Sequence, residues 1–376
     1  MLTKKEFVIK KHGIDSTYWA FFQKNGEIDI TPTILFAKMC EADRKRSWEL
    51  STIEQYASII AMFFGTMRMY QATIQTITTK ETQGFMQALY MKELPFQEKD
   101  GNPTSISRMN SVETVLIDLV EKAAQFGFRE DRSLSFNYKE ISGTLGKLDD
   151  ADRIHQCYIP TGLFEELIKH LKVDGDFEKE RDEIALRVGY ELGVRAEELV
   201  RKNNFSIERF KKARLTYKFG DEIDLRNIIG KGSKGGKARN VIIKPKLAVK
   251  VFDFIEKHKA IYKKSEHLFC HRSGRKLSPR HGTTTFRNAK NNLNHHELNN
   301  KSFQKLRHSY ATNMAIFCRK NGINSRLIQD RLGHANSSTT QLYIEVACLV
   351  EGDYDKAEEM RMVRHENRDK NKKRKK

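Results

Sequence analysis

Hydrophobic residues recur at steps of three and four positions over most of the chain, and this spacing places them on one face of an α-helix. The segment after Ser51 shows the pattern clearly, with apolar or aromatic residues at Ile53, Tyr56, Ile59, Ile60 and Phe63. Ser51 and Glu54 have the spacing of a capping box, so we expect this helix to begin at Ser51. A helix with one buried face is predicted.

Two further helices are predicted before residue 130. One covers residues 78–90, and the other covers residues 105–126 and ends at Gly127. Residues 1–45 are less regular, and we expect short helices there, one of them opening at Thr31. These segments together predict a small helical bundle.

Residues 131–158 are rich in Ser, Asn, Gly and Asp and show weak periodicity, which is typical of an interdomain linker. A new domain is expected from about residue 159, with helices over residues 163–171 and 184–192. Strand-like composition follows in three segments, residues 213–219, 224–229 and 239–243, and the glycine-rich turn 230–236 joins the last two.

Helical periodicity returns in residues 249–261, over most of residues 283–344 and again in residues 354–364. A short strand is predicted at residues 267–269. The basic run 368–376 is expected to be disordered. The fold class predicted by these patterns is mainly α with a small antiparallel β-sheet.

The 376 residues include 68 Lys and Arg against 49 Asp and Glu, a formal net charge of +19. Such a surplus favours a polyanionic partner, because lysines and arginines that neutralise phosphates release counterions. A generic basic surface is the alternative, so charge by itself does not identify DNA. A chain of this length is expected to form two domains.

Five cysteines lie at long spacings, which argues against a disulfide framework. The first residues show no apolar leader, and no run of about 18 apolar residues occurs. We therefore expect a soluble protein of a reducing cytoplasm, without a membrane partner.

The segment 301–343 carries the candidate chemistry. Arg307 opens an amphipathic stretch, a Leu-Gly-His turn ends at His334, and Tyr343 follows nine positions later. An arginine fork matches phosphate oxygens, and a histidine can donate a further hydrogen bond. A tyrosine hydroxyl can form a covalent intermediate. The three residues together indicate chemistry on a phosphate.

This ordered combination resembles the catalytic domain of the tyrosine recombinases, the phage integrase family, which break DNA strands with a tyrosine. The resemblance rests on Leu306-Arg307-His308-Ser309-Tyr310-Ala311-Thr312, on Leu332-Gly333-His334 and on Tyr343. It implies an N-terminal extension (1–45), a helical core-binding domain that grips DNA (46–130), a linker (131–158), a catalytic domain (159–365) and a basic tail (366–376).

A second stretch, Leu192-Gly193-Val194-Arg195-Ala196-Glu197-Glu198-Leu199, resembles the family's box for its first catalytic arginine. The resemblance gives Arg195 a phosphate-binding role. Glu198, three positions later, is expected to orient that arginine. The family usually has threonine at the position of Leu192. As an isolated fragment, the arginine and glutamate would be read as a surface pair that contributes little.

The glycine-rich run 229–237 contains the spacing of a dinucleotide-binding loop, but such a loop requires a following helix, and residues 241–243 have strand composition. A P-loop is excluded because Ala238 stands where Ser or Thr would bind magnesium. By resemblance, Lys231 is the general acid that enters the DNA minor groove, with Lys234 as the rival. Lys234, Lys237 and Arg239 are expected to contact DNA.

Gln304 stands where the family most often has histidine or lysine. A glutamine can hydrogen-bond a phosphate oxygen but takes up no proton at neutral pH. We interpret it as a substitute without an acid–base role, and reduced activity is the alternative. His308 is expected to support the site, His334 to contact the phosphate, and Tyr343 to be the nucleophile.

The resemblance implies a DNA recombinase or integrase that forms a 3′-phosphotyrosyl intermediate on double-stranded recombination sites, for integration, transposition or resolution of a mobile element. It implies a homotetramer on DNA that is a monomer or dimer when free, and accessory bending or directionality proteins are further candidate partners. It also implies a bacterial, nucleoid-associated protein. No cofactor, ATP or metal is expected. A zinc site at His267, Cys270, His271 and His281 is the metal alternative, but it lacks a second Cys/His pair with finger spacing.

Two alternatives stay open. One is a sequence-specific DNA-binding protein with impaired catalysis, and the other is a tyrosine-type topoisomerase. The helix at residues 354–364 is further expected to dock on a neighbouring subunit.

Overall fold

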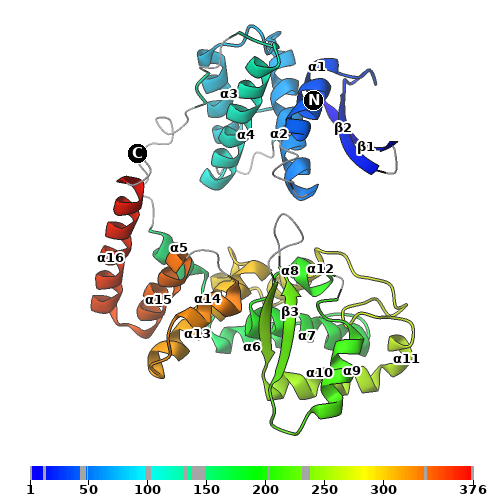
Figure 1. Cartoon of the computed structure of the whole chain (residues 1–376), viewed down its shortest axis with the longest axis vertical. Coiled ribbons are helices and arrows are strands. Elements are labelled where there is room, and N and C mark those ends of the chain that lie inside the picture. Colours follow the sequence, from blue (N-terminus) through cyan, green and yellow to red (C-terminus); the bar gives the residue numbers. More distant parts are fainter. Residues whose placement is uncertain are drawn as a thin grey trace. The chain divides into compact units, whose positions relative to one another are not determined.

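The computed structural model describes residues 2–11, 14–42, 48, 50–97, 103–130, 134–136, 149–201, 203–230, 238–333 and 337–373. The chain divides into two compact units, Met1–Lys147 and Leu148–Lys376 (Figure 1). Most of the described residues are helical, and the described part of each unit includes a two-stranded antiparallel sheet. The predicted fold class is confirmed.

The first unit begins with a β-hairpin in which β1 (Thr3–Lys11) pairs antiparallel with β2 (Ile14–Phe22). The prediction of short helices is therefore wrong for this stretch. It is confirmed for α1 (Ile30–Ala42). The fully buried Phe21 meets Phe36 of α1 edge to face, with ring centroids 5.8 Å apart. The hairpin depends on this packing against a helix, which local periodicity does not reveal.

Three longer helices complete the described part of the first unit: α2 (Leu50–Met69), α3 (Thr79–Met91) and α4 (Ile106–Gln125). The expected cap at Ser51 is wrong, because α2 already includes Leu50. Thr78 does cap α3, in a capping box with Glu81. Gly127, with a φ of 76°, follows the end of α4 as predicted. The helices pack around one apolar core that also includes Phe21.

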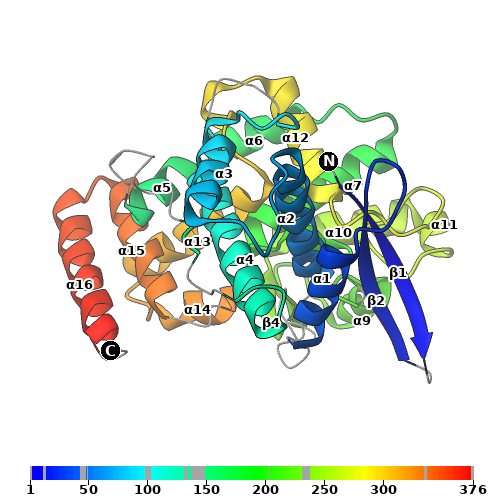
Figure 2. The same ribbon diagram turned by 90° about the horizontal axis from the view of Figure 1, so that it is seen from above.

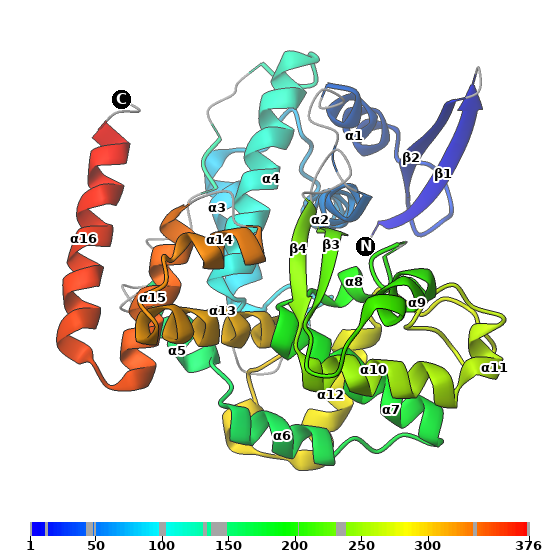
Figure 3. The ribbon, with the colours of Figure 1, turned by 60° about the horizontal axis from the view of Figure 1, so that its bottom comes forward.

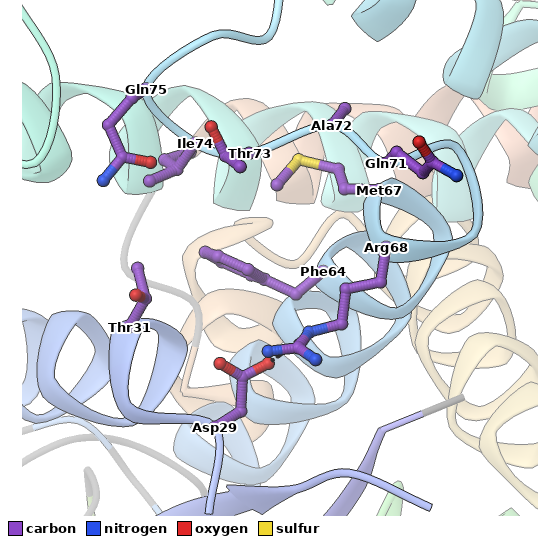
Figure 4. A pocket seen from close by; sticks show the side chains of 10 residues that line it. All are labelled: Asp29, Thr31, Phe64, Met67, Arg68, Gln71, Ala72, Thr73, Ile74 and Gln75. Carbon is purple, nitrogen blue, oxygen red and sulfur yellow. Dashed lines mark ion pairs between the residues drawn. The ribbon is translucent and has the colours of Figure 1, made fainter.

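A pocket lies between the start of α1, the end of α2 and the loop after α2 (Figure 4). At one side of it, Arg68 Nε lies 2.8 Å from Asp29 Oδ2, and only 5% of the Asp29 side chain is exposed. A carboxylate buried to this degree is stabilised by its ionic partner. The pair therefore links the beginning of α1 to the end of α2.

The second unit contains most of the helices. They are α5 (Asp150–Cys157), α6 (Thr161–Lys169), α7 (Asp176–Leu192), α8 (Ala196–Leu199), α9 (Ile207–Thr216), α10 (Pro245–Lys257), α11 (Lys259–Tyr262), α12 (His281–Leu293), α13 (Phe303–Lys320), α14 (Arg326–Leu332), α15 (Ser337–Glu351) and α16 (Tyr354–Lys373), with a 3-10 turn at His296–Leu298. Helix α5 falls inside the range predicted as a linker, yet it packs on α15. The predicted linker around residues 137–148 lies outside the described residues.

A second hairpin, β3 (Ile223–Ile229) with β4 (Ala238–Ile243), stands on the helical second unit, and both strands were predicted. Of the predicted glycine-rich turn, residues 231–236 lie outside the described residues. The strand predicted at residues 213–219 is wrong, since α9 extends to Thr216. The short strand predicted at residues 267–269 is also wrong, because the pairing of His267 with Ser206 is an isolated bridge and not part of a strand.

The last helices pack beside one another, with α15 between α5 and α16 (Figure 2). The fully buried Glu345 of α15 accepts hydrogen bonds from Arg361 Nε and Arg364 Nε, both at 2.9 Å. Asp149 and Asp152 at the start of α5 pair with the same two arginines. Helix α16 thus docks on its own chain through a buried charge network. It continues to Lys373, so the expected disorder from residue 368 is wrong for its backbone.

Candidate active site

Arg307 lies near the beginning of α13, and only 4% of it is exposed. Its two terminal nitrogens donate hydrogen bonds of 2.6 Å to the carbonyls of Gly193 and Leu332. These carbonyls belong to the carboxyl ends of α7 and α14, where free carbonyls and the helix dipole favour a cation. Arg307 is therefore fixed by two helix ends and retains further N–H groups for a ligand.

Gly193 ends α7 in the left-handed conformation, with a φ of 64°. A Cβ at this position would collide with the ring of Tyr310 on α13. Glycine is therefore required both by the backbone angle and by the close approach of α13. This contact brings Gly193, and with it the stretch that carries Arg195, against the helix that carries Arg307.

Glu198 of α8 is fully buried between two arginines. Its carboxylate accepts a 3.0 Å bond from Arg195 Nη1 and bonds of 2.6 and 3.2 Å from the terminal nitrogens of Arg239. It also accepts the backbone N–H of Arg195 at 3.0 Å. The predicted role of Glu198 in orienting Arg195 has a matching geometry, and the carboxylate holds a second arginine as well.

Arg239 occupies a different place from that expected of a DNA contact. It is 6% exposed, and its guanidinium faces Glu198 and not the solvent. The reason is the two-residue period of β4, which puts Arg239 on the same inward face as Val241 and Ile243. This signal is local to residues 238–243, where Arg239, Val241 and Ile243 alternate with Ala238, Asn240 and Ile242.

Three guanidinium groups and one carboxylate thus surround a single place in the second unit. Burial, the largest cause, and the nearby charges of Arg195 and Arg239 together lower the pKa of Arg307 to about 10. Positive groups outnumber the negative one, so the arrangement favours an additional anion. Of the three arginines, Arg195 has the most exposed side chain, at 32%, against 3% for Arg239.

Tyr343 lies on α15 and is 4% exposed. Its hydroxyl is 2.9 Å from Nδ1 of His308 on α13. Burial raises the pKa of the Tyr343 hydroxyl, while the positive charges of Arg307 and Arg195 act in the opposite direction. The predicted nucleophile therefore lies in the field of both predicted phosphate-binding arginines, within one chain.

His308 was expected only to support the site. Burial, together with the charges of Lys305 and Arg307, lowers its pKa to about 4. The ring is therefore neutral near pH 7, so it can accept a proton from the Tyr343 hydroxyl or donate one to it. No local pattern predicts this contact, because it joins two residues that are 35 positions apart and lie on different helices.

Gln304 is exposed in the first turn of α13, one helical turn before Arg307. The structure thus brings together Arg195, Glu198, Arg239, Arg307, His308 and Tyr343 in the second unit. Figure 3 shows the elements β4, α8, α13 and α15 of that unit. The other predicted site residues, Lys231, Lys234, Lys237 and His334, lie outside the described residues.

Within the part of the chain that the structure describes, no group of three or more His, Cys, Asp or Glu side chains is arranged to hold a metal ion. His281, one of the residues near the zinc alternative, instead pairs with Asp182 at 2.8 Å. Among the described helices, none is long and apolar enough to cross a membrane.

Comparison with known proteins places the second unit in a family. Residues 163–348 match the sequence model of the phage integrase family. The chain is 32% identical over 215 residues to the tyrosine recombinase XerA of Pyrococcus furiosus, a match that covers 54% of this chain and 64% of that protein. It is 30% identical over 220 residues to a tyrosine recombinase of Thermosipho africanus, covering 56% of this chain and 68% of that protein.

The chain spans only about half to two thirds of the length of the first curated relatives, 64%, 58% and 48%. Among solved structures, the fold is similar to the XerH site-specific recombinase bound to a palindromic difH substrate. That likeness has a TM-score of 0.58 and 18% identity, and it covers 86% of this chain and 82% of that one.

Proposed function

Because the chain belongs to the tyrosine recombinase family, we propose that it is a site-specific DNA recombinase that cleaves and rejoins DNA through a 3′-phosphotyrosyl intermediate. The observation that carries the proposal is the position of the Tyr343 hydroxyl, 2.9 Å from His308 and within the field of Arg307 and Arg195. A phenol that serves only as packing has no need of a surplus of buried positive charge beside it.

In the proposed reaction, the Tyr343 oxygen attacks the phosphorus of a DNA phosphodiester. The new bond joins that oxygen to phosphorus, and the bond from phosphorus to the 5′ oxygen breaks. The tyrosine proton passes to neutral His308, and Lys231 protonates the departing 5′ oxygen. Arg195, Arg307 and His334 stabilise the charge on the non-bridging oxygens, with Gln304 as a further hydrogen-bond donor.

The bond energy of the phosphodiester is conserved in the covalent link, so attack by another 5′ hydroxyl reverses the step without ATP or a metal. Strand exchange between two sites then requires four active sites, and the proposed assembly is a homotetramer on double-stranded DNA. We further propose that Lys234 and Lys237 contact the DNA and that the protein acts in the bacterial cytoplasm on integration, transposition or resolution of a mobile element.

A nicked suicide substrate tests the proposal, because the cut strand releases a short fragment and the protein stays attached. The chain is incubated, without ATP and with EDTA, with nicked duplexes of randomised sequence, and the DNA held covalently is sequenced. We expect adducts that are absent in Tyr343→Phe and enriched in one sequence. Adducts on any sequence would indicate a topoisomerase. Specific binding without an adduct would indicate a DNA-binding protein with impaired catalysis.

A further inference from the structure

Asn204 is a fully buried amide between α8 and the carboxyl end of β3. Its Nδ2 donates 3.0 Å hydrogen bonds to the carbonyls of Glu198 and Ile229. Its Oδ1 accepts the backbone N–H of Ile229 at 2.8 Å. The side chain thus satisfies both backbone groups of the last residue of β3, and a buried amide with several partners fixes the geometry around it.

A tight turn that closes between Arg201 and Asn204 holds Asn204 in this position. Asn203 adopts the left-handed conformation with a φ of 71°, which asparagine tolerates better than most residues. The backbone N–H of Asn204 closes the turn on the carbonyl of Arg201 at 3.2 Å. Arg201 in turn donates a 2.5 Å hydrogen bond to the carbonyl of Gly230. Arg201 and Asn204, which belong to the same turn, therefore both bind the end of β3.

These contacts connect two parts of the proposed active site. Glu198, whose carbonyl Asn204 binds, holds Arg195 and Arg239 through its carboxylate. Ile229 and Gly230 are the last described residues before Lys231, the proposed general acid. A displacement of about 1 Å in a catalytic group can lower a rate on the order of 100-fold. The strand end therefore needs a fixed position relative to the arginines.

We propose that Asn204 is a positioning residue that keeps the end of β3, and with it the attachment point of the Lys231 segment, in register with the Arg195–Glu198 pair. The inference rests on the proposed function, since it assumes cleavage by Tyr343 with a lysine as the proton donor. Asn204 itself touches neither DNA nor the reacting atoms in this scheme.

The proton transfer provides a selective readout. When phosphorus leaves a 5′ oxygen, the oxygen must gain a proton, and a general acid contributes about 100- to 10,000-fold to such steps. If sulfur replaces that bridging oxygen, the group departs as a thiolate and needs no proton, because a thiol such as that of cysteine has a pKa of only roughly 8.5. Loss of general-acid catalysis thus slows the oxygen substrate and spares the sulfur substrate, whereas general damage slows both.

The test compares single-turnover cleavage of both substrates by the full chain and by Asn204→Ala and Asn204→Asp. The Asp variant keeps the acceptor for Ile229 N–H and loses both donated bonds. We expect both variants to slow the oxygen substrate by about 10-fold or more and to cleave the sulfur substrate within about 3-fold of the parent chain. Lys231→Ala should give the same profile in a stronger form.

Asn313→Ala is the matched control. Asn313 lies on α13, accepts a 2.9 Å bond from Tyr158 and donates a 3.2 Å bond to Tyr190, away from the hairpin. Its replacement should change the two substrates equally. Thermal unfolding shows whether each variant is folded. Both cleavage rates scale with the folded fraction, so the ratio of the two rates does not depend on that fraction.

Equal loss on both substrates in the Asn204 variants, or no loss on either, would overturn the inference. So would a Lys231→Ala variant that sulfur does not rescue. The proposed function fails separately and recognisably, because in that case the parent chain itself forms no adduct with either substrate.

Discussion

The Tyr343 hydroxyl and Nδ1 of His308 lie 2.9 Å apart and share a hydrogen bond between α15 and α13. The bond is made within one chain. It holds the proposed nucleophile against the helix that carries Arg307. A single chain thus places the tyrosine, its neutral proton partner and the arginines close together.

The pH dependence of stability tests the burial of His308. Its pKa falls from 6.5 to about 4 on folding, so between these values the unfolded chain binds a proton that the folded chain does not. The sign is therefore a loss of stability as the pH falls. One pKa unit corresponds to about 1.4 kcal/mol, which gives a loss of roughly 3 kcal/mol from pH 6.5 to 4.

Urea unfolding of the parent chain and of His308→Gln over this pH range measures the difference. Glutamine does not titrate, so the variant should lose about 3 kcal/mol less than the parent chain as the pH falls. The Asp and Glu residues are the same in both proteins, so their contribution to the pH dependence of stability cancels in the comparison. Parallel curves would show that His308 is protonated equally in both states, contrary to its observed environment.

Arg307→Lys should abolish the bridge between the two helix ends. A single ammonium group cannot reproduce the fork that contacts both Gly193 and Leu332, so the guanidinium–phosphate geometry is lost as well. We expect the rate of adduct formation on a suicide substrate to fall by about 100-fold or more. Arg319→Lys, on the same helix but paired with Asp353, is the control and should cleave at a normal rate. A normal rate in Arg307→Lys would remove Arg307 from the mechanism.

Arg239→Met separates a structural role from a DNA contact. Because Arg239 is buried against Glu198, its removal should lower the free energy of unfolding by about 3 kcal/mol. The salt dependence of DNA binding should not change. Arg226→Met is the control for stability. This arginine lies on β3 with 78% of its side chain exposed, so its replacement should leave the free energy of unfolding nearly unchanged. A salt slope that falls by about 1 without loss of stability would instead support the original prediction of a phosphate contact.

Glu345→Gln should loosen α16 from α15. The substitution removes the buried charge that Arg361 and Arg364 share, so amide hydrogen exchange in α16 is expected to accelerate. Glu359→Gln, an exposed position on α16 that pairs with Lys356, should leave the exchange unchanged. Protection of α16 in the parent chain should not depend on protein concentration. Protection that rises with concentration would show docking on a neighbouring subunit, as the sequence had suggested.

Much of this protein is determined by sequence alone. The helices α3 and α4 were predicted with their starts, because Thr78 and Ser105 accept hydrogen bonds from the backbone of the first turn, which is a local interaction. The strands β3 and β4 were also predicted from a local feature, their strand-like composition on either side of a glycine-rich turn. The family also followed from the order of Arg195, Arg307 and Tyr343 along the chain.

Other features were decided only by tertiary structure. The N-terminal hairpin forms where helices were expected, because the burial of Phe21 depends on packing against Phe36 of the following helix α1, which the periodicity of the hairpin segment does not reveal. The bond between His308 and Tyr343 likewise joins residues that no local pattern connects. Propensity and capping act over a few residues, so the sequence determines elements and motif order. Convergence of distant side chains depends on how helices pack, and only the folded chain decides that.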